Sequence, residues 1–223
     1  GLHKSKIIPE NSIQAFKNAM GKNYAIEFDI NITIDNQIVI FHDDDLNRLC
    51  NKKERIEEVT YDFLKDLKLY ESDEKIPLLK ELLVEISGKI PLVIEIKKHK
   101  NIGILENKLV DLLENYKGKY LICSFEKNIL FWFKKNKPNF KRGLIFESNP
   151  KKFEKYNKTL FLYKYYKTKP DFISLDYKLL DSTIDDFCKK NSLQISFWTI
   201  KNKENYEKIK EKVDAIIFEK FTL

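Results

Sequence analysis

The sequence predicts an α/β fold, a (β/α)8 TIM barrel with a short insertion after the second strand, on three observations. Apolar, strand-like runs alternate with amphipathic, lysine-rich helical segments along most of the 223 residues. The runs that can form barrel strands number eight, the count that closes such a barrel. One interval, from about residue 44 to 88, contains no convincing barrel strand. We therefore expect one domain, residues 1–223, with that interval inserted in it.

The elements can be placed in order along the chain. A short first strand is expected at Gly1–His3 and a first helix at Ser12–Met20, preceded by Pro9-Glu10-Asn11 as a start signal. The second strand is expected at Tyr24–Ile30. The remaining six strands are expected at Leu92–Ile96, Tyr120–Phe125, Gly143–Phe146, Asp171–Leu175, Ile195–Ile200 and Asp214–Phe218.

The second strand is followed by a hairpin that does not belong to the barrel count. A central Asp35-Asn36 pair tolerates the positive φ angles of a tight turn, and so short a connection makes the next run antiparallel to its neighbour. If the turn centres on that pair, the numbers of paired residues sum to 71, and Asp29 lies directly opposite His42.

The insertion itself has a helical pattern. Thr60–Leu69 and Leu78–Ile86 are expected to be helical, the second one after Ile76-Pro77. No linker composition or internal repeat indicates a second domain. We interpret residues 44–88 as a lid or pocket wall over the catalytic end of the barrel.

Composition restricts the partners and the compartment. The 41 Lys and Arg residues against 34 Asp and Glu give a net charge of +7, but we interpret the charges as mixed along the chain, mostly on solvated helix faces, and expect no nucleic-acid partner. The three cysteines lack zinc or redox spacing, which favours reduced thiols. Without a membrane span or signal-peptide pattern we expect a cytoplasmic protein, with a removed signal peptide as the alternative. The oligomeric state stays open.

Two carboxylates interrupt an apolar strand. The period of two sends Glu27 and Asp29 to one face, and Glu95 occurs near the carboxyl end of a later strand, where barrel active sites are built. Three converging carboxylates repel one another unless a divalent cation or a permanent positive charge joins them. Hard oxygen ligands favour one calcium or magnesium ion. Glu95 and Lys97 share strand parity, so a buried ion pair or an outward salt bridge is an alternative reading of that motif.

Two histidines are expected beside this cluster. His3 ends the first strand and His42 lies on the hairpin. Imidazole suits proton transfer near neutral pH, and a pair supplies one base and one acid. The remaining histidine, His99, follows a strand in a lysine-rich stretch, and we expect it to be exposed and without a catalytic role.

Several motifs occur together in one order along the whole chain. They are His3-Lys4, Pro9-Glu10-Asn11, Glu27-Phe-Asp29, Phe41-His-Asp43, Leu46-Asn-Arg48, Ile76-Pro77 through Leu83, Glu95-Ile-Lys97 and Phe197-Trp-Thr199. In this order the chain resembles the glycerophosphodiester phosphodiesterase family. The resemblance implies a (β/α)8 barrel and metal-dependent cleavage of a small glycerophosphodiester to glycerol 3-phosphate and an alcohol.

The resemblance also implies roles for individual residues. Glu27, Asp29 and Glu95 match the metal ligands, His3 and His42 match the general acid/base pair, and Lys97 and Trp198 match positions that line the substrate site. The family usually has arginine where this chain has Lys4, so a single ammonium replaces a bidentate grip on phosphate. From the sequence alone, Trp198 is equally well interpreted as a residue that packs in the barrel.

Three alternatives stay open at this point. The attacking group is either the glycerol 2-hydroxyl, through a cyclic phosphate, or water. The substrate of a lysophospholipase D or of a polymer-directed hydrolase would need a wider or more apolar opening than the charged insertion suggests. A barrel that binds phosphorylated ligands or anionic surfaces through its lysines, without catalysis, is a third reading, although both histidines are present.

Overall fold

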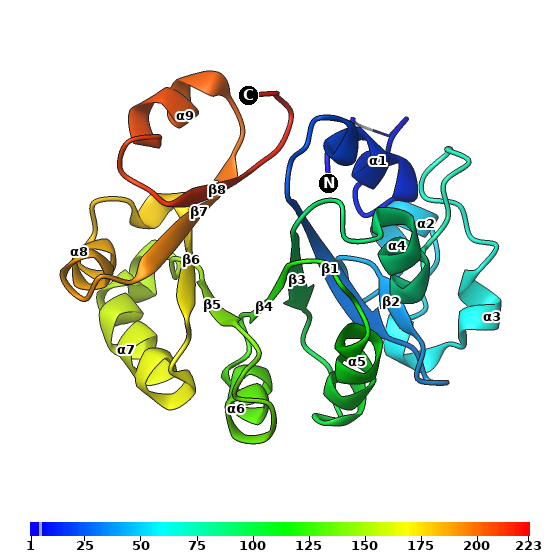
Figure 1. Ribbon diagram of the computed structural model, residues 1–223, viewed down its shortest axis with the longest axis horizontal. Helices are drawn as coiled ribbons and strands as arrows, with labels where there is room; N and C mark the ends of the chain where they lie inside the picture. The colour runs from blue at the N-terminus through cyan, green and yellow to red at the C-terminus, as the bar shows by residue number, and fades with distance from the viewer. Residues whose placement is uncertain (5) are drawn as a thin grey trace. The chain divides into compact units, whose positions relative to one another are not determined.

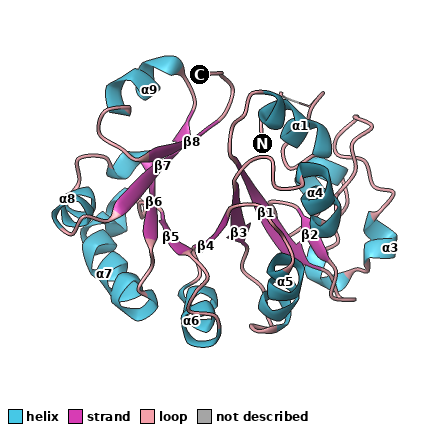
Figure 2. Ribbon diagram, viewed as in Figure 1, coloured by secondary structure: helices cyan, strands magenta, loops and turns pink. Residues whose placement is uncertain are grey.

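The computed structural model describes residues 1–4 and 6–223, which form two compact units, Gly1–Leu121 and Ile122–Leu223. Figure 1 shows the chain from end to end, and Figure 2 shows that strands and helices alternate in both units. The alternation agrees with the α/β class expected from the sequence. Within the described residues, no helix is both long enough and apolar enough to cross a membrane.

The first unit holds three complete strands and five helices among its described residues, and ends within β4 (Tyr120–Ser124). Its elements are α1 (Ile13–Gly21), β1 (Ile26–Ile32), β2 (Ile38–Ile40), α2 (Asn47–Cys50), η1 (Ile56–Glu58), α3 (Tyr61–Leu64), α4 (Leu79–Ile86), β3 (Leu92–Ile96) and α5 (Ile104–Glu114), where η1 is a 3-10 helix.

Helix α1 begins where the sequence predicts it. The side chain of Ser12 accepts a hydrogen bond from the amide of Ala15, as an N-cap residue does. The apolar face of α1 packs on β1, where the rings of Phe16 and Phe28 meet edge to face with centroids 5.7 Å apart. Both phenylalanines are fully buried, and each contributes about 2 to 3 kcal/mol through the apolar surface it removes from water.

Strand β1 pairs with two neighbouring strands, which run in opposite directions to each other. It is antiparallel to β2 and parallel to β3, as the hairpin and crossover lengths predict. The predicted hairpin register is wrong by one residue, because Ile30 pairs with Ile40 and the paired numbers sum to 70. The turn has three residues rather than two, closed by a hydrogen bond from the amide of Thr33 to the Gln37 carbonyl, with Asn36 at a φ of 59°. Asp29 therefore faces Phe41, and not His42, across the ribbon.

The first predicted strand, Gly1–His3, is not a strand in the structure. The nitrogen of Gly1 donates to the carbonyl of Glu27 at 3.0 Å, and the amide of Leu2 donates to Ala15 on α1. These are single contacts to two different elements, and they do not form the ladder that defines a strand. The seven other predicted barrel strands are all present as β1 and β3–β8.

The predicted insertion contains short helices joined by turns. Helix α4 matches the predicted Leu78–Ile86 segment, whereas the predicted helix at Thr60–Leu69 is limited to the four residues of α3. Leu46, Leu49, Ile56 and Leu64 of this region pack with Phe41 of the hairpin in one buried cluster. The cluster fixes the segment that follows His42.

The second unit is a parallel sheet with helices packed against it. After β4 come α6 (Lys127–Asn136), β5 (Arg142–Phe146), η2 (Lys151–Tyr156), α7 (Asn157–Thr168), β6 (Phe172–Asp176), η3 (Tyr177–Leu179), α8 (Thr183–Lys190), β7 (Gln194–Ile200), α9 (Lys203–Ile209) and β8 (Ala215–Phe218). Strands β4 to β8 pair in sequence order, each parallel to the next. Phe161 of α7 and Ile184 of α8 join the apolar residues of β5–β7 in the core.

Candidate metal centre and acid/base site

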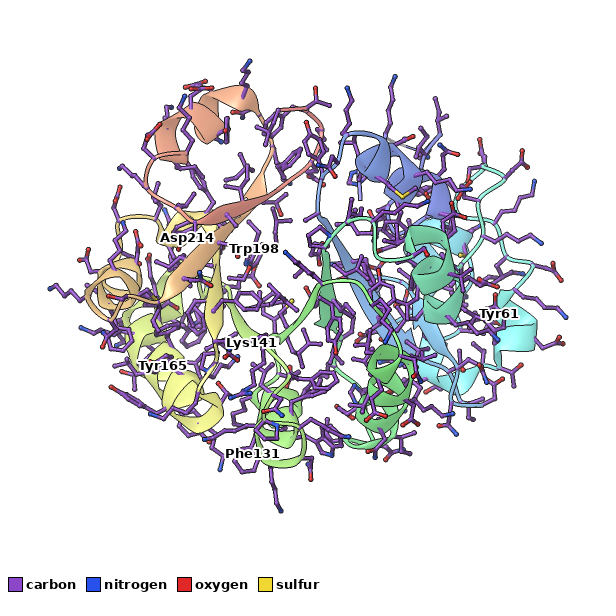
Figure 3. All side chains as sticks on the ribbon, viewed as in Figure 1. Tyr61, Phe131, Lys141, Tyr165, Trp198 and Asp214 are labelled. Carbon is purple, nitrogen blue, oxygen red and sulfur yellow. The ribbon has the colours of Figure 1, made fainter. Side chains whose placement is uncertain are left out.

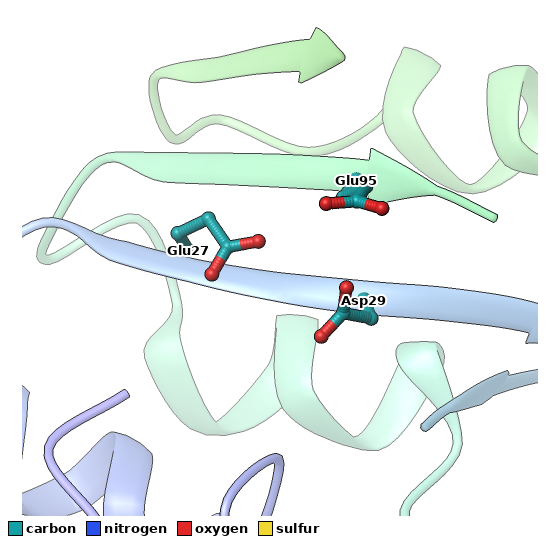
Figure 4. A group of neighbouring side chains, drawn as sticks. All are labelled: Glu27, Asp29 and Glu95. Atoms are coloured by element: carbon teal, nitrogen blue, oxygen red, sulfur yellow. The ribbon is translucent and has the colours of Figure 1, made fainter. Parts of the chain in front are cut away.

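Three carboxylates meet on one face of the β1–β3 pair. The parallel register sets Asp29 directly beside Glu95, and Glu27 shares the face of Asp29 because it lies two residues before it. One carboxylate oxygen from each residue lies within 4.8 Å of the others (Figure 4). Two oxygens bound to one calcium ion can be up to about 5 Å apart, so this spacing allows all three to share a cation.

Lys97 lies against two of these carboxylates. Its Nζ atom is 2.8 Å from Oε1 of Glu95 and 3.2 Å from Oδ1 of Asp29. Burial lowers the pKa of the Lys97 ammonium, but the charges of Asp29 and Glu95 raise it more, so the pKa ends above its ordinary value. Lys97 thus supplies a permanent positive charge in the cluster. This is one of the two ways, the other being a divalent cation, in which converging carboxylates can be stabilised.

Asn11 holds the other side of Asp29. Its Nδ2 atom donates to Oδ2 of Asp29 at 2.9 Å, and its Oδ1 atom accepts from the amide of Asp29 at 3.3 Å. Asn11 has a φ of 56°, a conformation that asparagine tolerates better than most residues, and it is 6% exposed. This double contact fixes both the backbone and the carboxylate of Asp29.

The cluster carries more negative charge than its own side chains neutralise. Burial raises the pKa of Glu27 well above its ordinary value, and the charges of Asp29 and Glu95 raise it further. Burial likewise raises the pKa of Glu95, with a further contribution from Asp29. Lys97 offsets one charge of three. A site of three hard oxygen donors with excess negative charge fits a divalent cation such as calcium or magnesium.

His42 is held by a chain of charged side chains. Its Nδ1 atom is 2.7 Å from Oδ1 of Asp43, whose two oxygens accept from Nη2 and Nε of Arg48 at 2.9 and 2.7 Å. Arg48 also donates to both carboxylate oxygens of Glu10, at 2.6 and 3.0 Å. Burial raises the pKa of Asp43, but the hydrogen bonds from Arg48 and His42 outweigh it and lower the pKa below its ordinary value. Asp43 is thus an ionised partner that orients the imidazole.

Three further predicted site residues, His3, Lys4 and Trp198, are also among the described residues. His3 is partly buried, and Lys4, which is exposed, forms a bridge with Ile8. Trp198 lies on β7 of the second unit (Figure 3), edge to face with Phe125 at 5.7 Å between centroids. Its Nε1 atom is buried and has no hydrogen-bond partner among the described residues.

The prediction that His99 is exposed is wrong. Its residue is 7% exposed, its Nδ1 atom lies 2.9 Å from the carbonyl of Lys97, and its Nε2 atom lies 3.2 Å from Oε1 of Glu106 on α5. The lysines around it in the sequence suggested a solvated loop. The buried carboxylate that compensates it comes from the following helix, a contact that local composition does not reveal.

Four residues of the site are not predicted as such from the sequence. Glu10 and Asn11 are expected there as a helix start signal, and Asp43 and Arg48 occur only as parts of motifs. A usable signal existed, because an asparagine ahead of the N-cap and an arginine five residues after Asp43 are polar residues with no evident local partner.

Comparisons with known proteins place the chain in a family. The profile of the Glycerophosphoryl diester phosphodiesterase family matches residues 4–222. A glycerophosphodiester phosphodiesterase of Caldanaerobacter subterraneus is 33% identical over 96% of this chain and 89% of its own length. A lysophospholipase D of Rattus norvegicus is 31% identical over 50% of this chain and 39% of its own length.

Solved structures share the fold. A phosphodiesterase from Oleispira antarctica in complex with the product sn-glycerol-3-phosphate aligns with a TM-score of 0.80 at 22% identity, over 94% of this chain and 87% of that one. Likeness to solved structures of this kind confirms the predicted α/β, TIM-barrel-like fold class. With the family profile matched over almost every residue, the chain belongs to the glycerophosphoryl diester phosphodiesterase family, and it is an enzyme of the phosphodiesterase class.

Proposed function

We propose that this enzyme hydrolyses small glycerophosphodiesters to glycerol 3-phosphate and an alcohol, as a single catalytic domain of residues 1–223. The observation that carries the proposal is the cluster of Glu27, Asp29 and Glu95, whose oxygens lie within 4.8 Å of one another, with the ammonium of Lys97 against two of the three carboxylates. Such a cluster of buried carboxylates costs folding free energy unless positive charge, such as a bound cation, offsets it. A family profile that covers both units supports treating them as one domain.

A divalent cation, calcium or magnesium, is the proposed cofactor, with Glu27, Asp29 and Glu95 as its ligands. A bound divalent cation would neutralise the phosphate oxygens that otherwise repel an attacking nucleophile. Asn11 keeps Oδ2 of Asp29 fixed, which limits the movement needed when a cation binds. Lys97, whose side chain is 14% exposed and whose ammonium lies next to Asp29 and Glu95, would meet the phosphate with a second positive charge.

His42 and His3 are the proposed acid/base pair. Asp43 fixes Nδ1 of His42, so the proton that His42 exchanges with the substrate is carried at Nε2. The His42 side chain is 52% exposed, so a ligand that enters from solvent can contact its ring. One histidine takes the proton of the attacking hydroxyl and the other gives a proton to the departing alcohol. Lys4 and Trp198 complete the proposal as substrate-binding residues.

The first test uses soluble substrates. Purified enzyme is incubated with glycerophosphocholine and glycerophosphoethanolamine, with calcium, with magnesium, and with chelator, and glycerol 3-phosphate is quantified. We expect product only with a cation, and a loss of about 100-fold or more in kcat for His42→Ala. Asp29→Asn should abolish the dependence on cation together with the activity. The matched control, Glu58→Gln, removes an exposed carboxylate of η1 and should leave turnover unchanged.

Two outcomes would sink the proposal. Full turnover in the presence of chelator would exclude the cation. Absence of product from every diester, by a protein that folds and binds calcium, would exclude hydrolysis and leave a binding role.

A lysophospholipase D activity is the second candidate. The observation that favours it is the likeness of half of this chain to the rat enzyme of that name. A lysophosphatidylcholine arm in the same assay separates the two, because lysophosphatidic acid forms only if the lysolipid is the substrate.

A further inference from the structure

Most of the net positive charge of this chain comes from one segment. Residues 150–169 contain seven lysines and one glutamate, a net charge of +6, whereas the whole chain has a net charge of +7. The expectation of charges mixed along the chain is therefore wrong for this segment. It forms η2 and α7 of the second unit, and most of its lysines are exposed.

Large apolar side chains are exposed in the same segment. Phe153 is 49% exposed, Tyr156 52%, Leu160 37% and Tyr163 55%. Leu160 and Tyr163 are three residues apart and lie on one face of α7, and Tyr156, the N-cap residue of α7, comes four residues before Leu160. What we call the aromatic–lysine patch consists of Lys151, Lys152, Phe153, Lys155, Tyr156, Leu160 and Tyr163.

The core does not need these side chains. The opposite side of α7 packs inward through Phe161, which is fully buried against Phe146 and Phe187. Tyr165, labelled in Figure 3, stacks on Phe161 and meets Phe187 edge to face. Helix α7 is thus held by its inner face, and its outer face carries apolar surface that costs free energy in water.

The lysines lie beside the exposed rings. The Nζ atom of Lys152 is 5.6 Å from the ring centroid of Phe153, and that of Lys155 is 5.0 Å from the ring centroid of Tyr156. Ammonium groups and amphipathic rings at one level are typical of protein surfaces that lie in the headgroup layer of a bilayer. The lysines meet anionic headgroups there, and the rings replace water with acyl-chain and glycerol surface.

We propose that the aromatic–lysine patch binds the surface of a bilayer that contains anionic lipid. Charge complementarity selects an anionic partner, and the exposed Phe153 and Leu160, which have no hydrogen-bonding group, select a bilayer over a nucleic acid. The segment also contains no arginine, the residue that nucleic-acid and phosphate forks favour. This inference does not depend on the hydrolytic activity.

The test is co-sedimentation of the whole enzyme with vesicles of phosphatidylcholine alone or with about 30% phosphatidylglycerol. We expect binding only to the anionic vesicles, weakened by high salt. K151Q/K152Q/K155Q should weaken binding roughly hundredfold, because each lysine near such a surface contributes about a factor of five to ten. F153S/Y156S/Y163S should weaken it at least about tenfold without changing net charge. K22Q/K52Q/K53Q, which removes three exposed lysines of the first unit, should bind like wild type.

The outcomes separate the explanations. Equal loss in K151Q/K152Q/K155Q and K22Q/K52Q/K53Q would show attraction by net charge alone and overturn the patch. Wild-type binding by F153S/Y156S/Y163S, tighter binding to a single-stranded oligonucleotide than to vesicles, or self-association through the patch in gel filtration would also overturn it. Hydrolysis of glycerophosphocholine by each variant is measured in parallel and should be unchanged, so failure of the patch and failure of the proposed function are read separately.

Discussion

The Nε2 atom of His99 lies 3.2 Å from Oε1 of Glu106, and the two side chains are 1% and 0% exposed. Among the described residues, neither atom has a partner with hydrogen-bond geometry. The other ring nitrogen of His99 contacts the carbonyl of Lys97, and the second oxygen of Glu106 accepts from the amide of Gly103 at 2.6 Å. The pair therefore joins the start of α5 to the segment that carries Lys97.

The His99–Glu106 pair makes stability depend on pH. Burial lowers the pKa of His99, but Glu106 and the Lys97 carbonyl raise it more, so the pKa lies above its ordinary value. A raised folded-state pKa gives stabilisation that is complete below the unfolded-state pKa and is lost as pH rises through the folded-state pKa. In urea unfolding, we expect Glu106→Gln to cost about 3 kcal/mol near pH 6 and less near pH 9.

The matched control is Glu85→Gln, which breaks the exposed contact of Glu85 with Lys17. Its cost should stay under about 1 kcal/mol at both pH values. If Glu106→Gln costs the same free energy of unfolding at both pH values, His99 does not carry charge in the folded protein.

A divalent cation should stabilise the folded enzyme. Calcium at about 100 times its dissociation constant should raise the free energy of unfolding by about 2.7 kcal/mol. For a protein of this size that raises Tm by about 5 to 10 °C. Lys97→Met should lower Tm in chelator, because three carboxylates then face one another without the ammonium. The rise on adding calcium should be larger in Lys97→Met than in wild type.

Differential scanning fluorimetry with calcium, magnesium and chelator measures both effects, and Glu95→Gln, which lacks a proposed ligand, should lose most of the rise. A rise in Lys97→Met no larger than in wild type would mean that the ammonium and the cation do not compete for the same charge.

The side chain of Asn11 should matter to catalysis more than to folding. Asn11→Gly keeps the φ of 56° without strain and removes only the two contacts to Asp29. We expect kcat to fall about 10- to 100-fold, because the carboxylate of Asp29 loses its orienting partner. Calcium titration by calorimetry should show weaker binding.

Asn11→Ala adds backbone strain to the same loss, so the difference in unfolding free energy between Asn11→Ala and Asn11→Gly isolates the conformational cost, about 1 kcal/mol. Unchanged calcium affinity in Asn11→Gly would remove Asn11 from the support of the metal centre.

The metal-site candidates could be predicted because strand periodicity is a short-range property. Glu27 and Asp29 must share a face at a spacing of two, and Glu95 lies at the end of a strand with the same kind of sequence. Parallel pairing then needed only one register to bring Asp29 beside Glu95. Every step follows from alternation along a strand and from the common direction of barrel strands.

The hairpin register could not be fixed in the same way. Whether Asp35-Asn36 closes a two-residue or a three-residue turn depends on a single residue, Ile34, that both turns tolerate. The shift of one residue moved His42 out of register with Asp29. Long-range contacts could not be predicted either. The His99–Glu106 and Arg48–Glu10 pairs do not follow from the periodicity of a strand or a helix.

The orientation of His42 gives a prediction that separates positioning from binding. Asp43→Asn keeps the size of the side chain but removes the negative charge beside Nδ1 of His42, and it removes one of the two oxygens that accept from Arg48. We expect kcat to fall by about 100-fold or more while KM changes little, because the imidazole loses its preferred tautomer and direction and the substrate contacts stay. Arg48→Lys loses the fork that grips both carboxylates and should show a smaller loss of kcat of the same kind. Steady-state kinetics on glycerophosphocholine measure the split, with Asp44→Asn, an exposed neighbour, as control. A large rise in KM at unchanged kcat in Asp43→Asn would place Asp43 among the substrate-binding residues and leave His42 without its orienting partner.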